Sequence, residues 1–246
     1  MIYEAVMDET VRSFGNALYE VLLTPEKLAE WEADREYMFF PHGTVITNEH
    51  MNLALKAGYQ PFFIQCGWDG NPLERDLVEQ SLFLGARGDF TQEELANNDI
   101  FVEVLGEPSK GIAQKIKKSE PNALALAVRN VLDPGEYSRD TKFILNADTL
   151  ISPVIEDKED ILELVGLISG ARFVLSGSLS VAAVAHAYGV PFSPMSSDFD
   201  DSENPLRWHD WFTSIGLDLY EVGAHDLPKN VRQGREWYNA HFVKED

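Results

Sequence analysis

Short apolar segments alternate with amphipathic ones along this 246-residue chain. Eight apolar segments have the length and the composition of buried strands. They are Tyr37–Phe40, Pro61–Cys66, Leu82–Ala86, Ile100–Leu105, Ala123–Val128, Leu150–Ile155, Arg172–Leu175 and Val190–Pro194. Between them, apolar residues recur at helical spacing, most clearly over Asp157–Ser169 and also over Lys110–Lys118 and Leu179–Tyr188. This alternation predicts βαβ units and therefore an α/β protein with parallel sheets.

A basic helix end followed by a Pro-Asn pair divides the pattern near residue 120. We expect an N-terminal Rossmann-like half in residues 1–120, and a C-terminal Rossmann-like half with a helical tail in residues 121–246. Each half would be a small open sheet with helices on both faces, and ligands of such paired folds bind at the carboxyl ends of the strands. One continuous sheet containing all eight strands is the alternative.

Composition narrows the class of protein. The formal net charge is −21, from 20 basic and 41 acidic residues, which argues against direct nucleic-acid binding because phosphate contacts need clustered cations. The single cysteine, Cys66, lies in an apolar run and predicts a core residue without a disulfide. We see no signal peptide and no apolar stretch of the roughly 18–20 residues that cross a bilayer. We therefore expect a cytoplasmic protein without a membrane span, and predict no metal site and no cofactor.

A tight turn joins the strand Arg172–Leu175 to the small-residue helix that follows it. The turn consists of Ser176, Gly177 and Ser178, and Ser180 lies in the first helical turn. Hydroxyls and backbone N–H groups at a helix N-terminus suit a phosphate or a carboxylate. Serine is also a favoured helix cap, so capping alone would account for Ser178.

Arg87 follows the strand Leu82–Ala86 in the segment Gly-Ala-Arg-Gly-Asp-Phe-Thr. Thr91 and Glu94 match a capping box, which predicts that a helix begins there. At the carboxyl end of a strand, the Arg87 guanidinium could bind a phosphate or carboxylate with two hydrogen bonds. A structural ion pair with Asp89 or with another acid explains the residue equally well.

Further candidates lie at the ends of other strands and in one aromatic segment. His42, Gly43 and Thr44 follow the strand Tyr37–Phe40, and Trp68, which follows Cys66, could stack on an acceptor or on a base. Glu107 lies in a Gly-Glu-Pro turn, where its carboxylate could act as a base or as a helix cap. Near the amino terminus, Gly15 and Asn16 form another glycine-bearing turn. Trp208, His209 and Trp211 fit either a packing helix or a platform that stacks on a sugar or a base.

Taken in order, these motifs resemble the polysaccharide pyruvyltransferase family, most closely its branch from exopolysaccharide gene clusters. The motifs are SFGNAL, HGT, CGW, GARGDFT, GEP, SGSLS and RWHDWFTSIGL, spanning residues 11 to 217. The arginine-bearing and tryptophan-bearing segments are the more specific of them. The resemblance implies a GT-B-like architecture of two facing Rossmann-type halves with the site in the cleft between them. It also implies transfer of a pyruvyl group from phosphoenolpyruvate to a pair of sugar hydroxyls.

The chain departs from the family at three positions. Asn16 and Glu107 stand where the family usually has aspartate, and Ser180 stands where it usually has histidine. A serine cannot deliver a proton near neutral pH as an imidazole can. His209 or His42 would then supply the acid. The donor would be held by Arg87 and by the turn residues Ser176, Gly177, Ser178 and Ser180, together with Gly15, Asn16, Gly43 and Thr44.

The sequence is compatible with three functions. The first is pyruvyl transfer from phosphoenolpyruvate to a carbohydrate acceptor. The second is a GT-B glycosyltransferase with a nucleotide-sugar donor, in which a tryptophan stacks on the base or the sugar and no histidine is required at position 180. The third is a non-catalytic, sugar-binding member of the fold.

Overall fold

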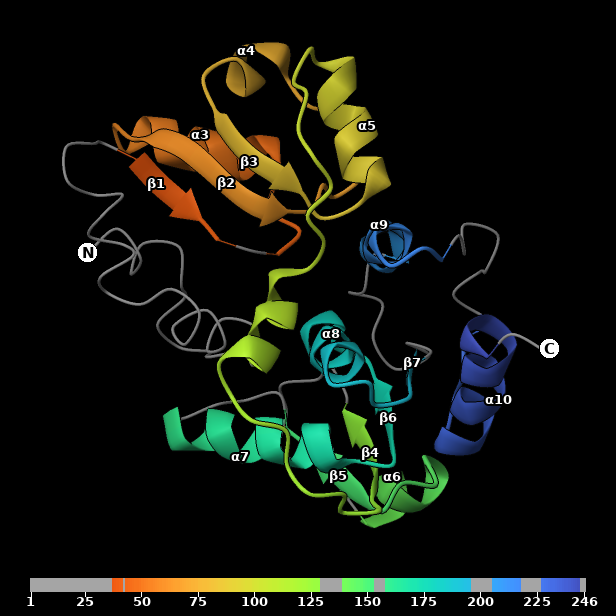
Figure 1. Cartoon of the computed structure of the whole chain (residues 1–246). Coiled ribbons are helices and arrows are strands. Elements are labelled where there is room, and N and C mark those ends of the chain that lie inside the picture. Colours follow the sequence, from red (N-terminus) through yellow and green to blue (C-terminus); the bar gives the residue numbers. More distant parts are fainter. Residues whose placement is uncertain are drawn as a thin grey trace. The chain divides into compact units, whose positions relative to one another are not determined.

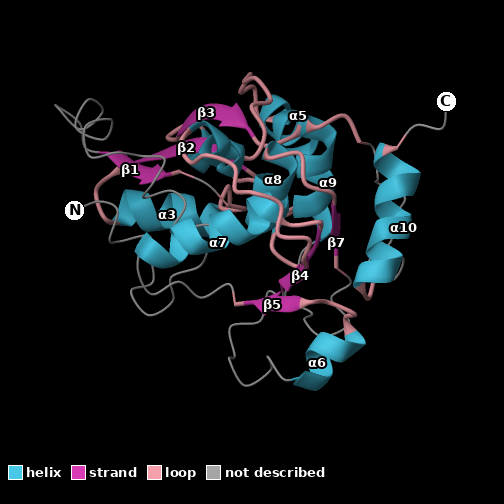
Figure 2. Ribbon diagram, turned by 60° about the horizontal axis from the view of Figure 1, so that its bottom comes forward, coloured by secondary structure: helices cyan, strands magenta, loops and turns pink. Residues whose placement is uncertain are grey.

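The computed structural model describes residues 37–41, 43–128, 139–152, 158–195, 205–217 and 227–243 (Figure 1). These residues form a mixed α/β protein with two sheets (Figure 2), one of three strands in the order β1-β2-β3 and one of four in the order β5-β4-β6-β7. Every neighbouring pair of strands is parallel. The α/β class with parallel sheets is therefore confirmed, and the described strands do not form one continuous sheet.

The described residues belong to two compact units. Unit 1 contains residues 37–41, 43–108 and 205–217, and unit 2 contains residues 109–128, 139–152, 158–195 and 227–243. The chain passes from unit 1 to unit 2 after Pro108, whereas the sequence pattern suggested a division near residue 120. The helix over residues 205–214 lies in unit 1, although the predicted C-terminal half would have contained it.

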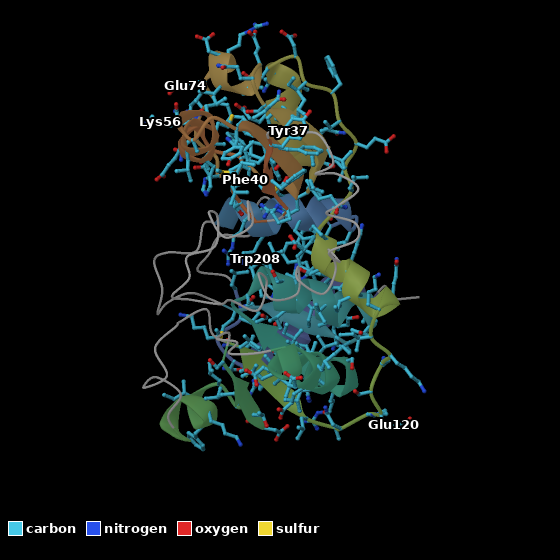
Figure 3. All side chains as sticks on the ribbon, turned by 90° about the vertical axis from the view of Figure 1, so that its left-hand side faces the viewer. Tyr37, Phe40, Lys56, Glu74, Glu120 and Trp208 are labelled. Atoms are coloured by element: carbon cyan, nitrogen blue, oxygen red, sulfur yellow. The ribbon has the colours of Figure 1, made fainter. Side chains whose placement is uncertain are left out.

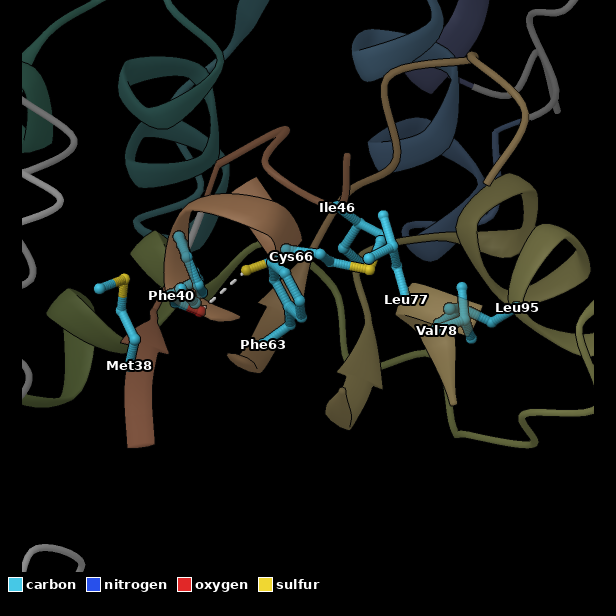
Figure 4. Close-up of a cluster of buried hydrophobic side chains, with 10 residues drawn as sticks. Met38, Phe40, Ile46, Phe63, Cys66, Leu77, Val78 and Leu95 are labelled. Carbon is cyan, nitrogen blue, oxygen red and sulfur yellow. Dashed lines mark hydrogen bonds between the residues drawn. The ribbon is translucent and has the colours of Figure 1, made fainter. Parts of the chain in front are cut away.

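Unit 1 is built from three strands and four helices of the described chain. In chain order they are β1 (Tyr37–Phe40), α3 (Asn48–Lys56), β2 (Gln60–Cys66), α4 (Arg75–Val78), β3 (Leu82–Ala86), α5 (Asp89–Asn97) and α9 (Pro205–Ser214). Helices α3, α4 and α5 cover one face of the sheet, where their side chains join Phe40 and Phe63 in a buried cluster (Figure 4). Cys66 lies in the same cluster and its thiol donates a hydrogen bond to the Phe40 carbonyl at 3.0 Å. Cys66 is therefore the buried core residue without a disulfide that the sequence predicted. Its burial raises the pKa of the thiol.

Unit 2 contains the second sheet and the helices around it. In chain order its elements are the 3₁₀ helix η2 (Pro108–Gln114), β4 (Ala125–Val128), α6 (Arg139–Ile144), β5 (Thr149–Ile151), α7 (Lys158–Gly170), β6 (Phe173–Ser176), α8 (Leu179–Ala187), β7 (Phe192–Pro194) and α10 (Val231–Phe242). All four residues of β4 and all four of β6 are buried, as expected of central strands in a parallel sheet. Side chains of β4 and β6 pack against Val231 of α10 in one cluster.

Two predicted elements differ from the structure. Ile100–Leu105 is not a strand: it pairs with β3 only around Ala86, through the bonds Ala86 N to Glu103 O and Leu105 N to Ala86 O. Gly85, next to this bridge, adopts a left-handed φ of 77°. Lys110–Lys118 is not an α-helix, because the helical residues there are the 3₁₀ helix η2, which contains Gly111, a residue of low helix propensity.

Among the described residues, no helix is both long enough and apolar enough to cross a membrane.

Candidate functional site

The turn between β6 and α8 lies at the point where the strand order of the second sheet reverses. The chain moves from β4 outward to β5, and then crosses back to β6 on the other side of β4 before continuing to β7. Strands β4 and β6 are therefore neighbours whose connections leave in opposite directions, and Val128 pairs with Ser176 at their carboxyl ends. In open α/β sheets, ligands bind at this kind of switch point.

Ser176 fixes the shape of this turn. Its Oγ accepts a hydrogen bond from the Ser178 backbone N–H at 3.0 Å and donates one to the Ser178 carbonyl at 2.8 Å. The Gly177 N–H donates to the Val128 carbonyl at 2.7 Å, which ties the turn to β4. Ser176 is fully buried, so it positions the turn from beneath.

Ser178 is the N-cap residue of α8, yet its side chain makes no capping hydrogen bond. Ser178 therefore occupies the cap position without using its side chain as a cap. Ser178 and Ser180 are both partly exposed, on the first turn of a nine-residue helix. The N-terminus of a helix carries partial positive charge and presents backbone donors, so two hydroxyls there suit an oxyanion.

Arg87, the other predicted donor ligand, lies in unit 1 and is 1% exposed. Its Nε donates to Asp210 Oδ2 at 3.1 Å and its Nη1 donates to Thr44 Oγ1 at 2.9 Å. The ion pair with an acid, which was the alternative interpretation, is thus present, and its partner is Asp210 of α9 rather than Asp89. Nη2 is buried without a hydrogen-bond partner.

The Arg87–Asp210 pair is enclosed by backbone. A Cβ on Gly67 would lie 2.0 Å from Arg87 Nη2, and a Cβ on Gly88 would lie 1.5 Å from the Asp210 carbonyl oxygen. Only glycine fits at these two positions, because no side chain can approach so closely. A donor could reach the guanidinium only if these groups separated, so the pair is architectural in this structure.

Asp210 also caps helix α5. Its Oδ1 accepts from the Thr91 backbone N–H at 2.9 Å, and its Oδ2 accepts from the Thr91 hydroxyl at 2.8 Å. Thr213 of α9 accepts from the Asp89 N–H at 2.9 Å. Helix α5 therefore begins at Asp89 and is capped by side chains of α9, which corrects the predicted Thr91–Glu94 capping box.

The tryptophans predicted to stack on a ligand contribute to packing in unit 1. Trp208 (Figure 3) and Trp211 are 6% and 2% exposed, and both rings contact Phe212 on the same helix. Trp68 is partly buried against the core cluster, and its ring N–H donates to the Asn71 carbonyl at 2.6 Å. Burial of Trp208 and Trp211 favours the packing-helix interpretation of their segment.

The remaining candidates are placed as follows. His209 is partly buried on α9, between Trp208 and Asp210 in sequence. Glu107 is 2% exposed in unit 1. It lies close enough to Cys66 for its charge to contribute to the raised pKa of the thiol. Gly43 accepts from the Gly67 N–H at 2.8 Å, beside Thr44. His42, Gly15 and Asn16 lie outside the described residues. The roles of these residues in catalysis or donor binding stay predictions.

Asp210 and Thr213 were not singled out from the sequence. Their signal was weak, because an acid and a threonine within an aromatic helix are ordinary surface residues of such a helix. The only sequence signal near Arg87 is the pair of glycines Gly67 and Gly88, because glycine is favoured where another group packs directly against the main chain.

No protein-family model matches this chain, and no curated protein matches its sequence significantly.

Proposed function

We propose that the protein is a transferase of the polysaccharide pyruvyltransferase type, which binds the anionic donor phosphoenolpyruvate at the start of α8. The observation that supports this most directly is the position of that helix start. It lies at the switch point of the four-stranded sheet, with the Ser178 hydroxyl not used as a cap. The motif resemblance contributes the identity of the donor and the pair of sugar hydroxyls as acceptor.

The proposed architecture is GT-B-like, with two facing Rossmann-type units. Two parallel sheets in two compact units support it. In this proposal unit 2 carries the donor phosphate at α8, and unit 1 carries the acceptor together with the acid His209. Small-angle X-ray scattering with and without phosphoenolpyruvate tests the arrangement, since closure of two facing units reduces the radius of gyration.

The proposed reaction converts the enol ester of phosphoenolpyruvate into a cyclic ketal. The two sugar hydroxyl oxygens form bonds to the central carbon of the donor, whose bond to the phosphate oxygen breaks. One of the two hydroxyl hydrogens ends on the methylene carbon, which becomes a methyl group, and the other ends on the released phosphate. Protonation of that carbon needs a general acid, which we assign to His209 because an imidazole titrates near neutral pH.

A ligand titration by thermal shift tests this proposal. Phosphoenolpyruvate should raise the melting temperature of the wild type, because a ligand that binds only the native state stabilises it. The double variant Ser178→Ala, Ser180→Ala should weaken this binding about 10-fold or more, since each hydrogen bond to a charged group contributes about 1.5–3 kcal/mol. Asn230→Ala is the matched control: it removes the cap of α10 in the same unit and should lower stability without changing the affinity.

A glycosyltransferase with a nucleotide-sugar donor is the second candidate, and Ser180 is the observation that favours it. A diphosphate needs hydroxyls and backbone donors at the helix start but no histidine there. Ser180→His separates the two candidates. The imidazole should leave phosphoenolpyruvate binding intact or improve activity with it, whereas it should crowd a diphosphate and weaken binding of UDP-glucose. If neither compound binds the wild type, the transferase proposal is wrong and the non-catalytic alternative stands.

A further inference from the structure

Helix α10 packs closely against β6 and β7 in unit 2 (Figure 1). Gly234 permits this approach, because a Cβ there would lie 2.5 Å from Ser193 Oγ and 3.0 Å from two carbons of the Phe173 ring. Ser193 is fully buried, and its Oγ has no hydrogen-bond partner. The packing of α10 on the sheet therefore leaves a polar group unused next to Phe173.

Arg235, the next residue of α10, lies beside the same ring. Its Cζ is 5.7 Å from the centroid of Phe173, and its Nη2 is buried without a hydrogen-bond partner. Contact with an aromatic face compensates a cation in part, but a buried charged donor also needs an acceptor. Because Arg235 as a whole is only partly buried, a ligand from solvent can approach this side chain.

No carboxylate among the described residues pairs with Arg235. The chain has 41 acidic and only 20 basic residues, so acids are in twofold excess. In unit 1 the buried guanidinium of Arg87 is paired with Asp210 at 3.1 Å. A buried guanidinium nitrogen without an acid in so acidic a chain suggests that the acceptor comes from outside the fold.

The charges around Arg235 favour an anion. The segment from Lys229 to Arg235 holds three cations and no acid, and the first turn of α10 has no acidic residue. Cations at this end of a helix are unfavourable by themselves, because the N-terminus carries partial positive charge. Glu236, which follows, is already paired with Arg232 at 3.3 Å. A bound anion would relieve this accumulation of positive charge.

We propose that Arg235 is the ligand of an oxyanion-binding site in unit 2, at the ring of Phe173. The ligand class is a small carboxylate or phosphate, since the oxygens of both accept charge-assisted hydrogen bonds from a guanidinium. This site is separate from the proposed donor site, because Phe173 begins β6 whereas the turn before α8 follows the last residue of β6, Ser176.

Anion titrations at constant ionic strength test the site. Sodium acetate or sodium phosphate, each replacing sodium chloride, should raise the melting temperature of the wild type, because a ligand that binds only the native state stabilises it. The salt with the larger shift identifies which oxyanion the site prefers. Arg235→Met should weaken this binding about tenfold or more, because the charge-assisted hydrogen bonds are lost.

Two further variants make the test specific. Arg232→Met is the matched control on the same helix: its side chain is 80% exposed, and the variant should keep the anion response of the wild type. Arg235→Lys keeps the charge but not the planar fork, so it should respond more weakly than the wild type. This variant keeps the test valid if Arg235→Met folds poorly.

The double variant Ser178→Ala, Ser180→Ala separates this site from the donor site. It should keep the Arg235-dependent anion response whether or not phosphoenolpyruvate binds at α8, so the two proposals fail independently. Equal anion responses of the wild type, Arg235→Lys and Arg235→Met would overturn the site. Absence of a response to both acetate and phosphate in the wild type would overturn it as well.

Discussion

Replacing Asp210 with alanine should release α9 from unit 1, and the size of the effect follows from the burial of its contacts. The carboxylate pairs with Arg87, caps α5 and accepts from the Thr91 hydroxyl, and its side chain is 1% exposed. Removing one partner of a buried pair costs about 3–5 kcal/mol, because the remaining charge is left uncompensated. Loss of a helix cap adds about 1 kcal/mol.

We therefore expect Asp210→Ala to lower the free energy of unfolding of unit 1 by about 4–6 kcal/mol. Natural domains have unfolding free energies of about 5–15 kcal/mol, so this single change should leave unit 1 marginal. Arg87→Ala should cost a similar amount. In the double variant the two losses should not add, and the difference should reveal a coupling energy of at least about 2 kcal/mol.

Urea unfolding followed by tryptophan fluorescence is a suitable assay, because Trp68, Trp208 and Trp211 all lie in unit 1. Arg75→Ala is the matched control: its ion pair with Asp99, at 2.7 Å, also lies in unit 1, but the two side chains are 63% and 70% exposed. That variant should lose no more than about 1 kcal/mol. If Asp210→Ala lost as little as Arg75→Ala, the pair would not hold α9 in place, and the architectural assignment of Arg87 would be wrong.

Three further outcomes follow from the same contacts. Gly67→Ala and Gly88→Ala should each destabilise unit 1 by about 1–3 kcal/mol or more in urea unfolding, because the added Cβ would overlap the Arg87 guanidinium and the Asp210 main-chain carbonyl respectively. Gly166→Ala on helix α7, whose Cβ would meet only Ser119 Oγ at 3.4 Å, should cost less. Gln65→Gly should raise stability in the same assay, because Gln65 has a left-handed φ of 54° that costs a residue with a Cβ about 1–2 kcal/mol; a loss of stability would show that the side chain contributes more than the strain costs. Burial lowers the pKa of both His50 and His186, so the unfolded chain binds protons that the folded one does not, and stability should fall as the pH drops below about 6.5; His50→Gln and His186→Gln should flatten this dependence in urea midpoints measured against pH.

Strand positions were predictable because each strand is short, apolar and bounded by turn residues. The predicted β1 and β3 agree with the structure in both bounds, and β2 differs by one residue. The strand predicted at Ile100–Leu105 is wrong, because an apolar run indicates that a segment is buried but not that it pairs with a neighbouring strand. There, the segment forms only one bridge with β3, between Ala86 and Val104, and the apolar pattern of the sequence does not indicate how far a segment pairs.

The sequence also predicted one helix start correctly and another one incorrectly. The start of α8 was placed correctly, since a Ser-Gly-Ser turn after a buried strand is a local signal. The start of α5 was placed two residues late, because the local Thr91–Glu94 pattern competes with a cap from α9. Capping by a distant element leaves no trace in the neighbouring sequence, so propensity arguments cannot find it.

Arg87 shows that the position of a residue at the end of a strand does not tell whether it binds a ligand or holds the fold together. At the carboxyl end of β3, a guanidinium suits an anionic ligand and an internal carboxylate equally well. The structure has the internal carboxylate: Arg87 pairs with Asp210, 123 positions away in the chain. Gly67 and Gly88 let the main chain pack closely around this pair. At the start of α8 the situation is the reverse, because Ser176 completes the turn and leaves the Ser178 hydroxyl out of the cap. A polar group that the fold does not use is the better candidate for a ligand, and for this reason we propose the start of α8, rather than Arg87, as the place where a donor binds.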